Sequence, residues 1–388
     1  MKKLIVVVAG LTLALAGCSP QLSSEKTVDN DSSSNTKKEA QIVTKNNISS
    51  DYYRTLLPYK ESPTRGLIVS NLNTRYDINE MEVGLQRIAT GMYNTDDFVF
   101  QEGQYLKKET VVSWLNRKYS DKQLKEKKLS DSDNVGLNPE FNGNGTDRNP
   151  IYLAHILEQN YLENKGDTVN LSGVTIGLAM NSVDYYQKES YGATYTTPIT
   201  TEKMKAEGEK MAATIITRMR QMKGLSEVPI TVAIFGQNAK DAMVSGNYIA
   251  SATAKAGSSE LDKWNSTDEK YVLFPSDDAK TNYLDDYNWF KSFSGDIQTY
   301  FSNYNGVIGR GFYQGKEMKR VTIDIPVNFF GEAEIIGFTQ FAADMVAKHV
   351  PSSVDVEVNI KTTDSQANAA LITRDSGSKK AEVHIFDR

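Results

Sequence analysis

The chain is poor in the side chains that most often form cross-links, bind metals or act as nucleophiles. Its 388 residues include one cysteine, Cys18, and three histidines. A single cysteine excludes an intramolecular disulfide, and it leaves the rest of the sequence without a thiol nucleophile. The serine-hydrolase pattern G-x-S-x-G is also missing.

The three histidines, His155, His349 and His384, are far apart in the sequence. None of them has a second histidine or a cysteine at the spacing of a metal site. His155 does not open the zinc-protease motif H-E-x-x-H, because an isoleucine follows it. The sequence therefore predicts structural roles for all three, no metal or cofactor, and no enzymatic activity.

Neither sign of charge dominates, since 44 lysines and arginines face 49 aspartates and glutamates, giving a net charge of −5. No basic stripe interrupts this mixture, which argues against a nucleic acid as partner. Beyond the first residues, no apolar run is long enough to cross a membrane. The hydrophobic content of 39% is still enough for sizeable cores, and the length allows two domains.

The N-terminus has the three-part layout of a secretory signal. Lys2 and Lys3 precede an apolar run over residues 4–15, and small residues lead into Cys18. This run is shorter than the roughly 20 apolar residues that a membrane-spanning helix needs. Residues 1–17 are therefore expected to be a cleaved signal peptide.

The end of this signal, Leu15-Ala16-Gly17-Cys18, matches the bacterial lipobox. The match predicts recognition of Leu15, Ala16 and Gly17 by the lipoprotein signal peptidase, cleavage before Cys18, and acylation of the Cys18 sulfur and new amino group. Each acyl CH₂ buried in a bilayer contributes about 0.8 kcal/mol, so two or three chains anchor a protein firmly. The expected partners are the membrane, through these chains, and the lipoprotein-processing enzymes. The expected location is the outer face of the cell membrane.

The rest of the chain is expected to have three parts. Residues 18–50 are rich in Ser, Asn, Lys and Asp and predict a lipidated N-terminus that continues as a disordered tether. An N-terminal α+β domain is expected over 51–165, and a C-terminal mixed α/β domain over 166–388.

Hydrophobic periodicity predicts an α+β or mixed α/β fold, with a mixed β-sheet, packed helices and two α/β subdomains. Helices are expected over 78–93, 109–119, 151–163, 201–222, 282–304 and 334–349. Strands are expected over 65–72, 174–181, 228–236, 247–254, 271–275, 307–313, 319–330, 354–361 and 381–386. The strand sequences VTIGLAMN at 174 and VTIDIPVN at 321 resemble each other, and each precedes a helix.

Aromatic residues recur at helical spacing within 282–304, including Phe290, Phe293 and Tyr300. This spacing is typical of the buried face of a helix. The alternative is a platform on which tyrosines and Trp289 stack against sugars of a cell-wall polymer.

Four longer stretches resemble the CamS family of lipoproteins, the sex pheromone precursors of Gram-positive bacteria. They are YRTLLPYKESPTRGLIV (53–69), EMEVGLQRIATG (80–91), DRNPIYLAHILEQNYL (147–162) and VIGRGFYQGKEMKRVTIDIPVNFFGEAEIIGF (307–338). The resemblance implies that the discarded signal peptide is trimmed to a hydrophobic heptapeptide or octapeptide that induces conjugative plasmid transfer.

The corresponding segment of this chain runs over residues 10–17. It consists of Gly10, Leu11, Thr12, Leu13, Ala14, Leu15, Ala16 and Gly17. It is apolar and uncharged, so it could enter a membrane and reach a peptide-binding pheromone receptor. The expected function is thus that of a non-enzymatic, lipid-anchored surface protein with a pheromone leader. The alternative is an extracellular lipoprotein that binds a small molecule or a cell-wall glycan.

Overall fold

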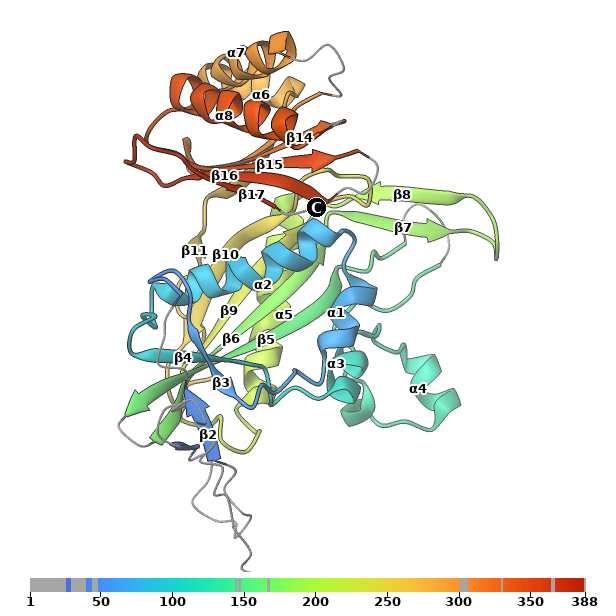
Figure 1. The fold of residues 1–388 in the computed structure, drawn as a ribbon. Coiled ribbons are helices and arrows are strands. Elements are labelled where there is room, and N and C mark those ends of the chain that lie inside the picture. The colour runs from blue at the N-terminus through green and yellow to red at the C-terminus, as the bar shows by residue number, and fades with distance from the viewer. Residues whose placement is uncertain are drawn as a thin grey trace, which may run out of the picture.

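The computed structural model describes residues 26–28, 40–43 and 48–386, apart from 144, 146–147, 166–167, 301–305, 329–330 and 364–366. Within this part, two β-sheets with their helices form two units stacked on each other, as Figure 1 shows. The α+β class expected from the sequence is confirmed.

The first sheet has the strand order β1-β2-β3-β4-β5-β6-β9-β10-β11. Its strands are β1 (Lys26–Val28), β2 (Ala40–Val43), β3 (Arg54–Leu57), β4 (Phe98–Glu102), β5 (Leu153–Lys165), β6 (Thr168–Asn181), β9 (Ile230–Gln237), β10 (Asn247–Ala254) and β11 (Asn265–Ser266). Its helices are α1 (Arg65–Asn71), α2 (Arg75–Thr90), α3 (Lys108–Leu115), α4 (Asp121–Lys127) and α5 (Thr201–Met219), with a 3₁₀ turn at Asp131–Asp133. A separate hairpin, β7 (Val183–Gln187) and β8 (Thr194–Pro198), projects from this unit (Figure 1).

The second sheet has the order β12-β13-β14-β15-β16-β17. Its strands are β12 (Glu269–Phe274), β13 (Ile308–Gln314), β14 (Glu317–Val327), β15 (Asp355–Thr362), β16 (Asn368–Arg374) and β17 (Glu382–Ile385). Its helices are α6 (Asp277–Asn282), α7 (Leu284–Tyr300) and α8 (Glu332–His349).

Helices cover both faces of the first sheet. On one face, Met211 and Ile215 of α5 pack in a core that includes Ile176 of β6. On the other face, Met81 and Leu85 of α2 pack in a core with strand residues of β9 and β10. Strand β9 is buried along its whole length, as expected for a strand covered on both sides.

The second sheet is packed on one face by α7 and α8, which lie on its far side from the first unit (Figure 1). Strand β14 alternates, with Val321, Ile323 and Ile325 buried in that core. Phe293 and Phe338, from the two helices, fill the centre of the core.

The two units share one chain pattern. In the first, β5 and β6 pair antiparallel, α5 crosses over to β9 parallel to β6, and β10 returns antiparallel. In the second, β13, β14, α8, β15 and β16 repeat this order. The similar sequences at 174 and 321 occupy equivalent strands, because Val174 pairs with Ile230 of β9 and Val321 with Val356 of β15.

Helix α2 lies between the two units. The Arg87 side chain of α2 forms a two-bond ion pair with Glu269, at 2.7 Å for both Nε–Oε1 and Nη2–Oε2. Arg87 also pairs with Glu80, which accepts a hydrogen bond from Tyr271 of β12. Arg310 of β13 lies 5.3 Å from the ring centre of Tyr76 on α2. Polar side chains of one helix therefore hold the second sheet against the first unit.

Two expected elements have a different type in the structure. Residues 65–72 were expected as a strand, but residues 65–71 form α1, with Ile68 buried on the helix and Leu72 buried at its C-cap. Residues 151–163, expected as a helix, form most of β5. This strand is buried on both faces, so it lacks the alternation by which strands are recognised.

The expected domain and tether limits fall inside the first sheet. Strands β5 and β6, which meet at the expected 165/166 boundary, pair along their length, and the change of sheet lies between 266 and 269. Strands β1 and β2 lie within 18–50, and Val43 is buried, so these pieces belong to the folded body. The remaining residues of the expected tether lie outside the described part, except for 48–50.

Candidate functional site

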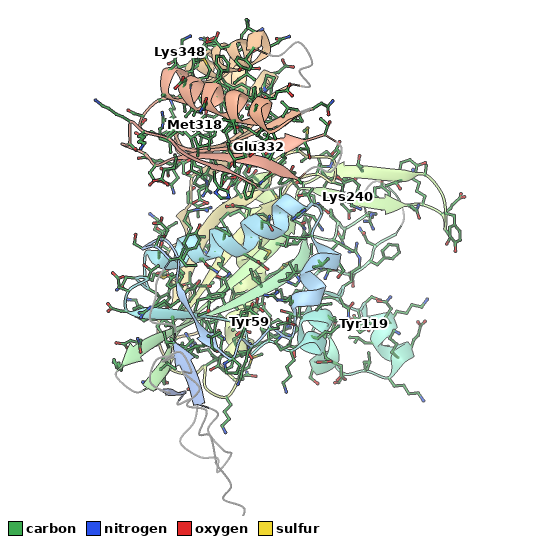
Figure 2. The ribbon with its side chains drawn as sticks, in the orientation of Figure 1. Tyr59, Tyr119, Lys240, Met318, Glu332 and Lys348 are labelled. Atoms are coloured by element: carbon green, nitrogen blue, oxygen red, sulfur yellow. The ribbon has the colours of Figure 1, made fainter. Side chains whose placement is uncertain are left out.

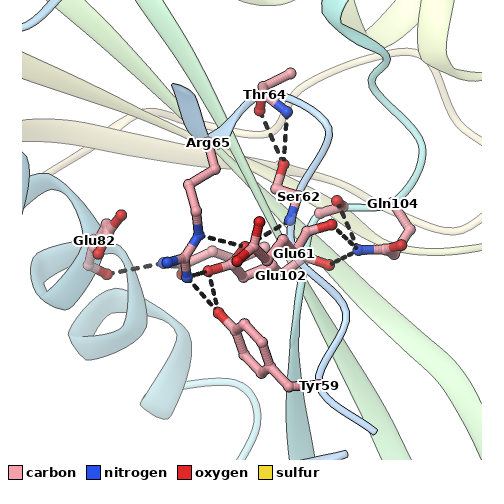
Figure 3. Close-up of polar contacts among 10 residues, drawn as sticks. Tyr59, Glu61, Ser62, Thr64, Arg65, Glu82, Glu102 and Gln104 are labelled. Carbon is pink, nitrogen blue, oxygen red and sulfur yellow. Dashed lines mark hydrogen bonds and ion pairs between the residues drawn. The ribbon is translucent and has the colours of Figure 1, made fainter. Parts of the chain in front are cut away.

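A cavity of about 260 Å³ opens in the first unit, between α1 and α2 and the strands β3, β4 and β5. Figure 2 labels Tyr59 at this position, and Figure 3 shows the charged groups beside it. The lining combines aromatic rings with charged and amide groups. These are Tyr52, Tyr53, Tyr59, Phe100, Arg65, Glu82, Glu102, Glu158, Gln86 and Gln159.

The back of the cavity is fixed by Glu158 of β5, whose side chain is almost fully buried. Its carboxylate accepts backbone N–H bonds from Gln104 at 2.9 Å, Tyr105 at 3.1 Å and Leu106 at 2.6 Å. A β-carbon on Gly103 would collide with Glu158, so the loop needs glycine there. Burial raises the pKa of Glu158, and the backbone donors oppose the rise. Glu158 thus serves to hold the loop that follows β4.

The charged centre of the cavity is an ion pair between Arg65, at the start of α1, and Glu102, at the end of β4. Arg65 Nε lies 3.2 Å from Glu102 Oε2, and a second guanidinium nitrogen contacts the other oxygen. The Tyr59 hydroxyl donates to Glu102 and accepts from Arg65, and the Ser62 amide donates to Glu102 at 2.6 Å. Burial favours a higher pKa for Glu102, but these donors outweigh it and hold the pKa below its usual value.

A second carboxylate, Glu82 of α2, faces the Arg65 guanidinium (Figure 3). Burial and the negative charge of Glu102 raise the pKa of Glu82, while Arg65 lowers it. One guanidinium therefore serves two carboxylates, and the centre has an excess of negative charge.

The aromatic part of the lining is held from behind. The Tyr53 hydroxyl donates to the carbonyl of Tyr93, and the Tyr53 ring lies 5.0 Å from that of Tyr161. Phe100 packs edge-on to Tyr161 at 6.2 Å. Burial, together with the hydrogen bond to Glu102, raises the pKa of Tyr59 to about 12, so its hydroxyl stays protonated at neutral pH. The rings form a pre-organised wall beside the charged centre.

Two of the carboxylates that line the cavity are poorly suited to proton transfer. A general acid or base needs a pKa near the working pH, whereas Glu102 is held ionised by several donors. Glu158 is saturated by backbone amides. Aromatic walls with a few fixed polar groups are typical of small-molecule sites.

A second hollow, of about 410 Å³, lies at the carboxyl end of β6 near the base of the β7–β8 hairpin, where Figure 2 labels Lys240. Its amides satisfy each other, since Gln237 accepts from the Asn73 amide at 2.8 Å and donates to Asn181 at 3.0 Å. The nearby Asp184 pairs with Arg148. The first cavity is therefore the better candidate.

The site residues predicted from the sequence, Cys18 and the leader segment 10–17 with Leu15, Ala16 and Gly17, lie outside the described residues. The three histidines, all among the described residues, do not line the cavity. His155 is buried, which lowers its pKa to about 3. His349 Nε2 lies 2.8 Å from Asp296 at the end of α8, and His384 packs against Phe386. Within the described residues, no three His, Cys, Asp or Glu side chains gather as metal ligands would.

The aromatic helix expected over 282–304 is α7, and its main face is core. Phe290, Phe293 and Ile297 are buried, as the core interpretation predicted. Trp289 donates to Asp286 at 2.9 Å and packs beside this core. Among the helices of the described residues, none combines the length and apolar character that a bilayer span requires.

The sequence alone does not predict the cavity residues Tyr59, Arg65, Glu82 and Glu102. They come from three separate elements and the loop before α1, and the expected strand over 65–72 misplaced Arg65. A related signal in α2 concerns the contact between the two units, where Glu80 is buried beside the apolar Met81 while Val83 is 52% exposed. Acidic residues on the buried side of a helix indicate charged partners elsewhere in the chain.

Comparisons with known proteins agree over most of the chain. The family model described as CamS sex pheromone cAM373 precursor matches residues 59–380. A sex pheromone precursor from Lactobacillus salivarius subsp. salivarius UCC118, known from its crystal structure, is 33% identical. It covers 90% of this chain and 99% of its own, with a TM-score of 0.81. The C-terminal domain of the sex pheromone staph-cAM373 precursor from Staphylococcus aureus is 32% identical. The match covers 82% of this chain and 99% of that domain, with a TM-score of 0.70. No curated protein matches the chain.

Proposed function

Because the chain belongs to the CamS family of sex pheromone precursors, we propose that it is a lipid-anchored surface protein whose leader is a peptide signal. In this proposal Cys18 carries the acyl chains, and residues 10–17 are trimmed from the discarded leader. The observation that carries it is the lipobox Leu15-Ala16-Gly17-Cys18 at the end of an apolar leader, in a chain of this family.

The position of β1 sets how far the folded body can stand from the membrane. Strand β1 begins at Lys26, eight residues after Cys18, and pairs with both β2 and β6. An extended chain spans at most about 3.5 Å per residue, so the anchor lies within roughly 28 Å of the first sheet. The body would therefore remain close to the lipid headgroups.

Replacement of the lipidated cysteine tests the anchor. We expect Cys18→Ala to remain as the longer precursor, because the signal peptidase acts on the acylated thiol. Its matched control is Ser19→Ala, which leaves the lipobox intact and should be processed normally. A Cys18→Ala protein that is cleaved and still membrane-bound would contradict the proposal.

The signalling role is tested with the synthetic peptide Leu11–Gly17 on plasmid-bearing responder cells. Conjugative transfer should rise at low peptide concentration and stay at background with a scrambled peptide of the same composition. Silence across a panel of responder plasmids would remove the pheromone role and leave the anchor untouched.

The folded body has a second candidate function, the binding of a small molecule or a glycan unit without catalysis. The cavity between α1, α2 and β3–β5 favours it, because aromatic rings stand beside a fixed charged centre. We expect Tyr52→Ala to weaken the binding of such a ligand, since Tyr52 lines the cavity and is 58% exposed. Tyr191→Ala, at the fully exposed hairpin tip, is the control. Saturation-transfer NMR with a panel of charged and neutral small molecules and sugars measures the difference.

A further inference from the structure

We propose that the cavity between α1, α2 and β3–β5 binds an organic cation, that is, a ligand carrying an ammonium group. This inference deepens the second candidate function, ligand binding in the cavity, and depends on it. The inference follows from the charge around the cavity, the kind of surface beside that charge, and the size of the space.

The charge is unbalanced in one direction. Among the residues that the structure describes, Arg65 is the one cationic side chain that lines the cavity, and Glu82 and Glu102 face it from α2 and β4. Glu102 accepts hydrogen bonds from Arg65, Tyr59 and Ser62. Glu82 has to share the single Arg65 cation with Glu102, so the two carboxylates outnumber the guanidinium that faces them. A ligand cation near Glu82 would restore neutrality.

The surface beside Glu82 suits such a cation. The rings of Tyr52, Tyr59 and Phe100 line the same cavity. Aromatic faces attract ammonium groups through the ring quadrupole, and a neighbouring carboxylate adds direct attraction. Arg65 already uses this contact, because its guanidinium lies 5.5 Å from the ring centre of Tyr59.

Other ligand classes fit less well. An anion would have to approach Glu82 and Glu102 with one guanidinium between them, and that guanidinium is already paired. A neutral ligand could stack on the rings but would add no positive charge to a centre that has two carboxylates and one guanidinium. The volume of about 260 Å³ is below the usual range for drug-sized ligands, so the cation is small.

The test uses the full mature chain with its anchor, held in a maltoside detergent that has no ammonium group. The first probe pair is choline and its neutral carbon isostere, 3,3-dimethylbutan-1-ol. The second pair is glucosamine and N-acetylglucosamine, which separates a sugar amine from its neutral counterpart. Affinities are measured by saturation-transfer NMR titration at low salt. We expect at least one cation to bind about tenfold more tightly than its neutral partner.

Two substitutions should act in opposite directions. Glu82→Gln keeps the shape and removes the charge, so the affinity for the cation should fall several-fold. Arg65→Gln removes the competing cation, so the affinity should rise. Glu260→Gln is the matched control, because Glu260 is exposed in the loop after β10 and does not line the cavity. Circular dichroism of each variant checks that the fold is retained.

The outcomes separate the two proposals. Tighter binding of a cation, weakened by Glu82→Gln and unchanged by Glu260→Gln, supports the inference. Equal or tighter binding of the neutral partner, sensitive to Tyr52→Ala, overturns the ammonium ligand and leaves ligand binding standing. Binding of neither pair overturns the inference, and an empty result with the wider panel would also remove the second candidate function.

Discussion

The most informative perturbation of the fold is Arg87→Met, at the contact between the two units. The Arg87 side chain is 22% exposed and lies between Glu80 and Glu269, whose side chains are 6% and 5% exposed. Removing the cation leaves two buried carboxylates facing each other without compensation. The loss of one partner of a buried ion pair costs about 3–5 kcal/mol, and we expect this range for the free energy of unfolding at pH 7.

The pH dependence gives this prediction a definite sign. Burial raises the pKa of Glu80, and Arg87 is the main opposing charge. Without Arg87 the folded-state pKa of Glu80 should rise further above the unfolded value. A carboxyl with a raised folded-state pKa favours folding at low pH, and this contribution is lost as the pH rises through that pKa. The cost of Arg87→Met should therefore shrink between pH 7 and the region just above pH 4.

Urea unfolding of the unmodified protein and of Arg87→Met, followed by tryptophan fluorescence at pH 7 and pH 5, measures the loss of stability at each pH. Lys319→Met is the control, because Lys319 pairs with Glu317 on the surface, where an ion pair contributes about 0–1 kcal/mol. A cost below about 1 kcal/mol at pH 7, or a cost that grows as the pH falls, would refute the reasoning.

Three further predictions concern buried groups in the two units. Glu158→Gln should lower the free energy of unfolding in urea by about 1–3 kcal/mol, because it places an amide NH₂ among backbone N–H donors. The loop at 103–106 should also become sensitive to proteolysis. An unchanged urea midpoint would contradict this prediction. Phe293→Ala should lower the free energy of unfolding, measured by thermal denaturation, by about 3–5 kcal/mol, because Phe293 of α7 is fully buried against the second sheet. A loss below about 1 kcal/mol would contradict this packing. His155, with its pKa lowered to about 3, should stay neutral in the folded state, whereas the unfolded chain takes up a proton there below about pH 6.5. The free energy of unfolding should therefore fall by about 1.4 kcal/mol per pH unit below that pH. His155→Gln should remove this contribution to the pH dependence of unfolding.

The elements that could be predicted from the sequence are those with a clear period and a clear cap. Helix α5, expected over 201–222, begins at Thr201, where the Thr200 side chain accepts from the Lys203 amide at 3.3 Å. Strands β6 and β14 were also placed correctly, and their similar sequences occupy equivalent positions in the two units. In these cases local pattern and tertiary environment agree.

The failures have a physical cause in tertiary burial. Strand β5 carries four buried polar residues, His155, Glu158, Gln159 and Asn160. Because the strand is covered on both faces, its sequence does not alternate between apolar and polar residues. Helix α1 is short and buries few residues, so its apolar run could not be told from a strand. Strand β16 (Asn368–Arg374) was not predicted at all.

The cavity could not have been assembled from the sequence for a related reason. Tyr59, Arg65, Glu82 and Glu102 are brought together by the pairing of β4 with β5 and by the placement of α1 and α2 on that sheet. In the sequence, each of these residues resembles an ordinary polar side chain exposed to solvent. The lipobox was different, because adjacent residues carry its whole signal and no fold is needed to interpret it.

The central claim is that the chain is anchored through Cys18 and releases its leader as a peptide. The most direct measurement is the intact mass of the mature protein extracted from membranes, together with the peptides in the culture supernatant. We expect a chain that starts at an acylated Cys18 and a fragment from residues 10–17 outside the cell. A protein that keeps residues 1–17, or that starts at any other residue without acyl chains, would contradict it.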